Sequence, residues 1–245
     1  MNKTSSGTIS LSPSKLSVFT ECPRCFWLQM NEKVKRPRGP FPSLPGGIDR
    51  KLKPYFDSYR AKGQMPPEFE GKLPGRLFED QERLRRWRYW KSGLYYRNEE
   101  LNVEMVTALD DLLVDVQEDG TGLYIPFDYK TKGGVPKTNG AEFYQVQLNC
   151  YELALDANGY KTCGKGVLAY VYPEDLERDD LDEMRCVVPF DFGVQVYELP
   201  TNLEDAKKLI ERACEVLRGG LPASMPGCEY CGYAEGYQKV VGERT

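Results

Sequence analysis

The 245-residue chain contains no histidine. That absence excludes Ser-His-Asp hydrolases, Cys-His proteases, histidine-ligated catalytic zinc and any reaction whose general base is an imidazole. Catalysis by this chain would have to rest on carboxylate, lysine, tyrosine or thiolate groups.

Long apolar stretches are missing as well. No uninterrupted hydrophobic run approaches the roughly 20 residues that a membrane-spanning helix requires, and residues 1–6 hold no apolar signal core. Hydrophobic residues make up 40% of the chain and charged residues 29%, which is ordinary for a folded protein. We therefore expect a cytoplasmic protein with no membrane association, whose thiols stay reduced.

Caps, turns and hydrophobic spacing predict helices and strands in a mixed order. The first helix begins at Pro13 with Ser12 as its N-cap, and the last follows Asn202. Between them the patterns predict helices over 48–61, 79–90 and 141–158, a three-stranded meander over 101–109, 112–116 and 123–130, and strands over 166–172 and 183–199, the last interrupted near 191–193. The order indicates a single α/β domain with three parts, an N-terminal helical part over 12–93, a core over 94–200 and a C-terminal part over 201–245.

The net charge is −4, yet basic residues are concentrated in stretches such as 83–91. Aromatic residues interleave there with Lys91 and four arginines, as in a helix that contacts nucleic acid: Arg83, Arg85, Arg86 and Arg88. The alternative is an amphipathic helix that buries Leu84, Trp87 and Trp90, which are spaced by threes, and leaves its arginines in solvent. The arginines remain able to contact DNA under either interpretation.

Carboxylates and a lysine recur on two neighbouring predicted strands. Asp110 lies between the first and second strands of the meander, beside the third strand, on which Asp128 and Lys130 alternate so that both project from one face. Two carboxylates on adjacent strands form a hard-oxygen site suited to magnesium or manganese. A lysine beside such a metal can orient or deprotonate an attacking water and stabilise charge on a phosphate. The pattern predicts metal-dependent phosphodiester hydrolysis without histidine; the alternative is a solvated cross-strand ion pair.

A polar pair follows on the next predicted helix. Gln147 and Tyr151 lie one turn apart on one helical face, where a packing pair would be the simplest interpretation in isolation. The ordered set resembles the PD-(D/E)XK nuclease superfamily, and within it the RecB-like branch that includes the AddB nuclease and the CRISPR-associated RecB-like exonucleases. That branch places an aspartate after a hydrophobic strand, then a strand ending Asp-Tyr-Lys-Thr, then a helix with Gln-x-x-x-Tyr, as at Asp110, residues 128–131 and residues 147–151.

The resemblance implies a restriction-endonuclease-like core in which helices flank a central mixed sheet. Asp110 and Asp128 would hold magnesium or manganese, Lys130 would complete the catalytic set, and Gln147 with Tyr151 would bind substrate. The implied activity is a DNA nuclease, an exonuclease more than an endonuclease, acting on single-stranded DNA or DNA ends in repair, recombination or CRISPR adaptation. Helicases and CRISPR or repair proteins are the partners that it implies.

Members of this branch carry a metal-binding histidine in a helix that follows a glycine-rich turn. Here Gly46 and Gly47 precede Asp49, which is either a substitute oxygen ligand or a first-turn acid favoured by the helix dipole. The missing histidine motivates a second hypothesis. In it the chain is a catalytically weakened or inactive nuclease-fold module that binds DNA or assembles with partners.

Four of the eight cysteines form two CxxC pairs at opposite ends of the chain. The pairs are Cys22 with Cys25 and Cys228 with Cys231, and together they supply four ligands for zinc or a 4Fe-4S cluster. The resemblance favours the cluster, because iron-sulfur nucleases of this branch clip their N-terminal and C-terminal segments together with four cysteines. Their usual pattern is one plus three, whereas this chain has two plus two. A zinc-ribbon-like scaffold with no nucleic-acid role would explain the cysteines but not the carboxylate and lysine motifs.

The remaining four cysteines occur singly. A single cysteine on an apolar face usually acts as a small hydrophobe. We therefore expect core packing for these four: Cys150, Cys163, Cys186 and Cys214.

Overall fold

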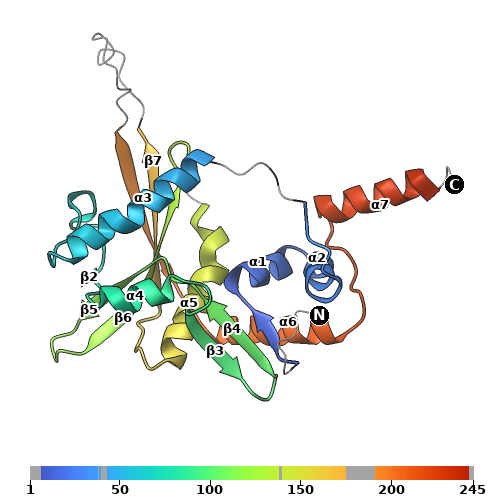
Figure 1. Ribbon diagram of the computed structural model, residues 1–245, viewed down its shortest axis with the longest axis horizontal. Helices are drawn as coiled ribbons and strands as arrows, with labels where there is room; N and C mark the ends of the chain where they lie inside the picture. Colours follow the sequence, from blue (N-terminus) through green and yellow to red (C-terminus); the bar gives the residue numbers. More distant parts are fainter. Residues whose placement is uncertain (1–6, 38, 40–42, 138–139, 175–190, 243–245) are drawn as a thin grey trace, which may run out of the picture.

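The computed structural model describes residues 7–37, 39, 43–137, 140–174 and 191–242, which form two β-sheets surrounded by helices (Figure 1). The larger sheet has the strand order β2-β5-β6-β7-β8, with bounds Arg76–Leu77, Asp111–Val116, Gly122–Thr131, Lys165–Pro173 and Phe192–Pro200. The smaller sheet has the order β1-β4-β3, with bounds Ile9–Leu11, Val103–Thr107 and Leu94–Asn98.

Helices precede, connect and follow these strands. The α-helices of the described ranges are α1 Pro13–Glu21, α2 Pro23–Trp27, α3 Ser43–Arg60, α4 Gln81–Trp87, α5 Gln145–Ala157, α6 Leu203–Arg218 and α7 Glu229–Gly242. One π-helical turn, Leu28–Glu32, extends α2, and 3-10 turns form at Pro67–Phe69 and Gly140–Tyr144.

The larger sheet is mixed, because β6 and β7 run parallel while its other neighbours are antiparallel. Parallel neighbours require a long crossover, and here α5 lies in it. Residues 148–155 of α5 are all buried, since the helix packs against strands of both sheets and against α1 and α6. This mixed α/β architecture confirms the predicted fold class and sets α5 beside the central strand β6.

The predicted three-stranded meander is wrong. β4 pairs with β3 and β1 in the small sheet, whereas β5 pairs with β6 and β2 in the large one. β3, which the hydrophobic pattern does not predict, takes β4 into the small sheet by forming a hairpin with it through a turn at Asn102, whose φ is 43°. The chain then leaves the small sheet before Asp111 and enters the large one. Of the predicted 183–199 strand, β8 covers the end, and residues 183–190 lie outside the described ranges.

The helix predictions are confirmed with shifted bounds. The Ser12 hydroxyl accepts from the Lys15 amide at 3.4 Å at the start of α1, and Asn202 caps α6. α3 starts earlier than predicted, at Ser43. α4 ends at Trp87 instead of residue 90, where the chain turns and the Ser92 hydroxyl donates to the Arg86 carbonyl at 2.8 Å.

The two ends of the described chain meet through cysteines. Cys22 and Cys25, at the start of α2, lie against Cys228 and Cys231, at the start of α7. From this junction α7 projects away from the sheets (Figure 1). None of the helices in the described ranges combines the length and the hydrophobicity that a bilayer crossing requires.

Gly93 permits the close approach of the β3–β4 hairpin strands. A Cβ at this position would overlap the carbonyl oxygen of Thr107. We expect Gly93→Ala to lower the free energy of unfolding by about 1–3 kcal/mol, measured by urea titration with circular dichroism. Gly134→Ala is the control, because its Cβ would meet no atom within 4 Å. Equal stability of the two variants would contradict the close approach.

Candidate functional site

Strand β6 carries the first part of the site. Asp128 and Lys130 share one face, as predicted, and the Lys130 Nζ lies 2.6 Å from the Asp128 Oδ2. Phe127 and Tyr129 project to the opposite face, where the Tyr129 ring stacks on Phe56 with centroids 5.2 Å apart. The aromatic core thereby fixes which way the polar pair points.

Asp110 joins this pair from the start of β5. Register in the sheet sets Asp111 opposite Phe127, so the preceding residue lies near Asp128. The Lys130 Nζ is 3.7 Å from the Asp110 Oδ2, and the two carboxyl groups also share a hydrogen bond. The structure therefore brings together the three residues that the sequence predicts as catalytic: Asp110, Asp128 and Lys130.

The pKa values of Asp110 and Asp128 are shifted in opposite directions. Burial raises the pKa of Asp128 well above its ordinary value, and the neighbouring Asp110 carboxylate raises it further. Burial would also raise the pKa of Asp110, but the hydrogen bond with Asp128 and the ammonium groups of Lys130 and Lys53 outweigh it and lower that pKa. Two carboxyl groups this close repel each other when both are ionised, and a cation between them would relieve that repulsion.

A divalent cation fits this donor set. The Asp128 side chain is 0% exposed, and its Oδ2 has no hydrogen bond of acceptable geometry although the Lys130 ammonium lies beside it. A buried carboxylate is costly unless a cation compensates it, and the Lys130 ammonium already does so, so the fit to a metal rests on the chemistry of the two neighbouring carboxylates. Carboxylate oxygens are the ligands that magnesium and manganese prefer.

Helix α3 adds a lysine that sequence reasoning missed. The Lys53 Nζ lies 2.9 Å from the Asp110 Oδ1 and 3.9 Å from the Asp49 Oδ2. Asp49 therefore lies at the margin of the site, one helical turn before Lys53. The i, i+4 spacing of the two residues is the sequence signal that could have indicated a shared partner.

Helix α5 braces the site from behind. The Gln147 side-chain amide donates to the Asp128 Oδ1 at 2.9 Å and contacts the Tyr151 hydroxyl. That hydroxyl donates to the Ala108 carbonyl at 3.0 Å, two residues before Asp110. Burial raises the pKa of Tyr151, whose side chain is 3% exposed, so the phenol stays protonated and keeps both bonds. The helix face carries the predicted pair, and its two members hold the two aspartate segments.

A buried network of ion pairs lies directly behind Asp110. The Asp111 carboxylate, 0% exposed, accepts two hydrogen bonds from the Arg60 guanidinium, at 2.6 and 2.7 Å, and one from Arg88 at 3.0 Å. Arg88 also pairs with Asp57 at 2.7 Å and donates to the Asp110 carbonyl at 2.8 Å. Burial raises the pKa of Asp111, while the two guanidinium groups oppose that rise. The network ties α3 and α4 to the first residues of β5.

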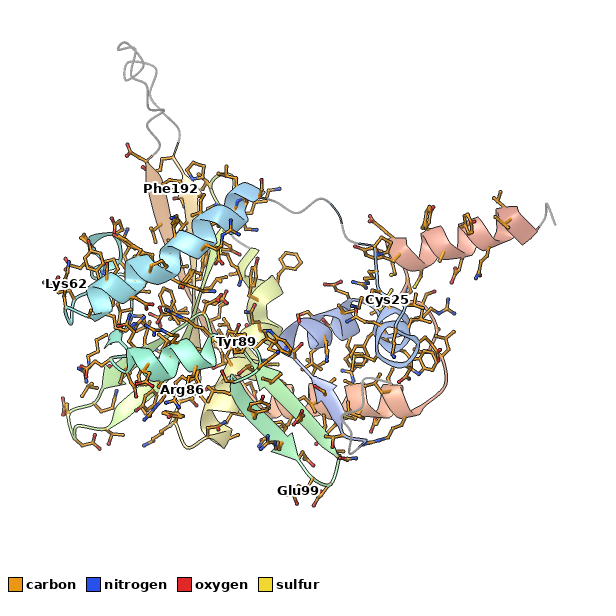
Figure 2. All side chains as sticks on the ribbon, viewed as in Figure 1. Cys25, Lys62, Arg86, Tyr89, Glu99 and Phe192 are labelled. Atoms are coloured by element: carbon orange, nitrogen blue, oxygen red, sulfur yellow. The ribbon has the colours of Figure 1, made fainter. Side chains whose placement is uncertain are left out.

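The basic aromatic segment is divided between core and surface. Arg88 points inward to the buried network and its side chain is 11% exposed, so the prediction that this arginine lies in solvent is wrong. Leu84 and Trp87 are buried as the amphipathic interpretation predicts, but Trp90 is 62% exposed because α4 has already ended. Two further arginines of the segment are exposed, Arg85 and Arg86. Figure 2 places Arg86 on α4 and Tyr89 just beyond the end of that helix.

The four paired cysteines form one cluster. The Cys22 Sγ lies 3.8 Å from the Cys231 Sγ, and the Cys25 Sγ lies 3.7 Å from that of Cys228 and 3.6 Å from that of Cys231. All four sulfur atoms lie within 4.8 Å of one another, so that the cluster could bind a metal ion or a metal cluster. It connects segments 209 positions apart and confirms the predicted clip between N-terminal and C-terminal segments.

The single cysteines follow the expectation where they are described. Cys150 and Cys214 are 0% exposed within hydrophobic clusters, and Cys163 is partly buried beside the core. Burial raises the pKa of Cys150 to about 12, which keeps this thiol protonated. Cys186 lies outside the described ranges.

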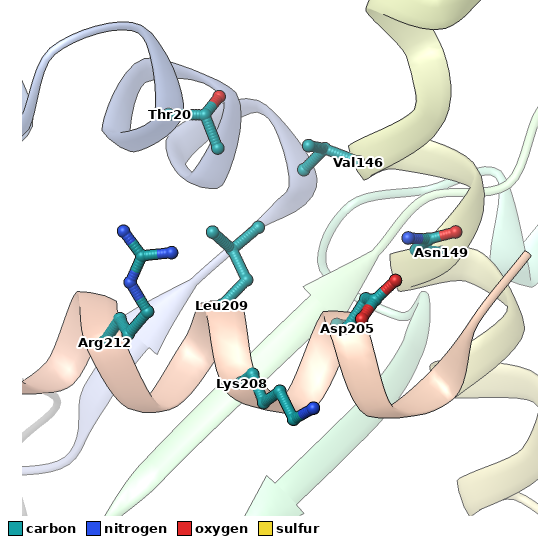
Figure 3. Close-up of a pocket in the computed structure, with 8 residues that line it drawn as sticks. Thr20, Val146, Asn149, Asp205, Lys208, Leu209 and Arg212 are labelled. Carbon is teal, nitrogen blue, oxygen red and sulfur yellow. The ribbon is translucent and has the colours of Figure 1, made fainter.

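A separate pocket of about 310 Å³ lies between α1, α5 and α6 (Figure 3). Its lining includes Val146 and Asn149 from α5, and Leu209 and Arg212 from α6. None of the carboxylate-site residues lines it. The Asn149 side-chain Oδ1 accepts a hydrogen bond from the backbone N–H of Asn202 at 3.2 Å, so this polar side chain already supports the start of α6.

Comparison with known families gives one match. The family model described as the PD-(D/E)XK nuclease superfamily matches residues 48–235. The matched span includes Asp49, the carboxylate and lysine residues, helix α5 and the second cysteine pair. No curated protein matches the chain.

The buried network generates a stability prediction. Arg60→Met would leave the Asp111 carboxylate buried with only Arg88 beside it, so we expect a loss of about 3–5 kcal/mol of unfolding free energy. The control is Lys165→Met, which removes a pair with Glu198 at 3.3 Å whose side chains are 52% and 48% exposed. That variant should lose about 1 kcal/mol or less in the same denaturant titration. Similar losses in both variants would argue against the network as a structural anchor.

Proposed function

Because the chain belongs to the PD-(D/E)XK nuclease superfamily, we propose that it is a magnesium- or manganese-dependent deoxyribonuclease. The family implies a nucleic-acid substrate. The observation that carries the proposal is the convergence of Asp110, Asp128 and Lys130 at the paired ends of β5 and β6. Metal-dependent phosphodiester hydrolysis at this site needs no histidine, because carboxylates can hold the metal and a lysine can assist the attacking water.

In this proposal Asp110 and Asp128 hold the divalent metal, and Asp49 is positioned to supply a further oxygen from α3. The bound metal would supply Lewis-acid stabilisation of the phosphate and lower the pKa of a water. Gln147 fixes the Asp128 carboxylate through its amide. The buried hydroxyl of Tyr151 donates to the Ala108 carbonyl. In this proposal Tyr151 positions the segment that carries Asp110 and does not contact the substrate.

Lys130 acts as a cation in the proposed reaction. Burial alone would lower the pKa of Lys130, but the carboxylates of Asp128 and Asp110 outweigh it and raise that pKa. The side chain is therefore an ammonium at neutral pH. It can orient a water by donating a hydrogen bond and can stabilise negative charge that develops on a phosphate oxygen.

Single-stranded DNA and DNA ends are the proposed substrates, with exonuclease action in repair, recombination or CRISPR adaptation. The support is the surface beside the site. Arg88 reaches the Asp110 carbonyl, and the neighbouring exposed residues are basic and aromatic: Arg85, Arg86, Tyr89 and Trp90. Cationic side chains contact phosphates and exposed rings stack on unpaired bases, which a duplex interior does not offer.

The four-cysteine cluster has a structural role in this proposal. It would bind zinc or a 4Fe-4S cluster away from the carboxylate site and hold the chain ends together. A helicase or a CRISPR or repair protein is the class of partner proposed for such a nuclease, in the cytoplasm.

The proposal predicts a strong effect of Lys130→Ala. We expect cleavage of labelled single-stranded DNA with manganese or magnesium to fall by about 10²–10⁴-fold, because the cation beside both carboxylates is removed. Lys161→Ala, which removes an exposed lysine away from the site, should cleave like the wild-type chain.

The wild-type chain is the deciding arm of that experiment. If it cleaves neither single-stranded nor double-stranded DNA with either metal but still binds DNA, the weakened or inactive nuclease-fold module becomes the better description. Equal cleavage by the wild-type and Lys130→Ala proteins would contradict the assignment of this site as the catalytic one.

The exposed arginines generate a binding prediction. We expect Arg85→Ala/Arg86→Ala to weaken binding of single-stranded DNA in the presence of a chelator, measured by fluorescence anisotropy. The slope of log affinity against log salt should become shallower by about 0.7 for each phosphate that an arginine no longer neutralises. Lys161→Ala/Lys208→Ala removes two charges elsewhere and should leave the slope nearly unchanged. Identical slopes for all proteins would exclude α4 from the DNA-binding surface.

A further inference from the structure

We propose that the four-cysteine cluster binds one tetrahedral zinc ion and not a 4Fe-4S cluster. This inference is independent of the proposed nuclease activity. It rests on the separations of the sulfur atoms, on the backbone that carries them and on the charge that surrounds them.

The sulfur separations match a single ion. Four sulfur atoms at about 2.3 Å from a central zinc, in a tetrahedron, lie about 3.8 Å from one another. Three sulfur pairs of the cluster are separated by 3.8, 3.7 and 3.6 Å, and no pair exceeds 4.8 Å. Three of the six sulfur pairs therefore lie at the edge length of a zinc tetrahedron, and the other three lie within 4.8 Å.

The same separations do not fit a 4Fe-4S cluster. In such a cluster each cysteine sulfur bonds a different iron at a corner of a cube that also contains four sulfides. The cysteine sulfurs then stand outside eight core atoms, and they must lie farther apart than sulfurs that share one ion. To reach the wider separations of a 4Fe-4S cluster, the four sulfur atoms would have to move apart. Each cysteine pair lies on one short turn at the start of a helix, so α2 and α7 would have to separate.

The backbone around the cluster supports a compact site. Each CxxC pair spans the start of a helix: Cys22 is the N-cap of α2 with Cys25 inside it, and Cys228 immediately precedes α7, which contains Cys231. Backbone amides of Met225 and Cys25 donate to the Cys22 sulfur. Amide donors of this kind stabilise metal-bound thiolates and fix their orientation.

A guanidinium group compensates the charge of the site. Four thiolates around one divalent ion carry two net negative charges, and the Arg36 side chain donates to the Cys25 sulfur. Arg24, which lies on α2 beside Cys25, pairs with Glu235 of α7 at 2.6 Å and donates a hydrogen bond to the Pro222 carbonyl at 3.0 Å. Figure 2 places Cys25 at this junction of α2 with α7. A tetrahedral site of four sulfurs suits zinc or iron, and zinc binds such divalent sites more tightly than ferrous iron does.

The test is metal and sulfide analysis of the full chain purified anaerobically from cells supplied with iron. We expect about one zinc per chain, no acid-labile sulfide and no visible colour. Cobalt(II) exchanged into the site should produce the intense visible bands of tetrahedral thiolate coordination. About four irons and four sulfides with a brown chromophore would overturn the proposal, as would a single iron or a chain without metal.

Variants separate this site from the carboxylate site. Cys228→Ser should lose the zinc and lower the melting temperature by roughly 5 °C or more. Cys163→Ser, which changes a partly buried thiol outside the cluster, should retain both. Asp128→Asn should also keep its zinc, so that a metal held by the carboxylates cannot account for the result. If Cys228→Ser fails to fold, the wild-type stoichiometry and the cobalt spectrum still decide the question.

Discussion

The carboxylate of Asp111 is the buried charge on which the arrangement of the site depends. Two guanidinium groups hold it, one from the end of α3 and one from the residue after α4. An unpaired carboxylate at this depth would cost several kcal/mol, so these ion pairs stabilise the positions of α3 and α4 against the start of β5. The same ion pairs fix the position of Asp110, the residue before Asp111. Arg88 donates a hydrogen bond to its backbone carbonyl, and its side chain lies beside Lys130.

The parts of the site that are local in sequence could be predicted. Alternation on a strand sets Asp128 and Lys130 on one face, and helical spacing sets Gln147 beside Tyr151. The order of these motifs indicates a fold in which they converge, and the mixed sheet with α5 as its crossover bears out the fold. Cap residues predict the starts of α1 and α6 equally well, since Ser12 and Asn202 hold those helices through contacts within three residues.

The parts that depend on long-range pairing could not be predicted in this way. Lys53 reaches Asp110 and Arg60 reaches Asp111 from a helix about fifty residues earlier, and no periodicity reports such contacts. The division of β4 and β5 between two sheets escapes prediction for a similar reason: a hydrophobic strand shows which face is buried but not which neighbour it will choose. The spacing of Trp90 predicts burial, and its exposure reflects only where the helix stops.

The cysteine clip has a consequence for the order in which the chain is made. Cys22 and Cys25 leave the ribosome early, and they remain two ligands short of a full set while the sheets, α5 and α6 are synthesised. The second pair emerges only when the rest of the core is already outside. Binding of the proposed metal by all four cysteines would therefore have to follow the synthesis of the core, and a chain truncated before residue 231 would keep the carboxylate site but lack the full set of four thiols.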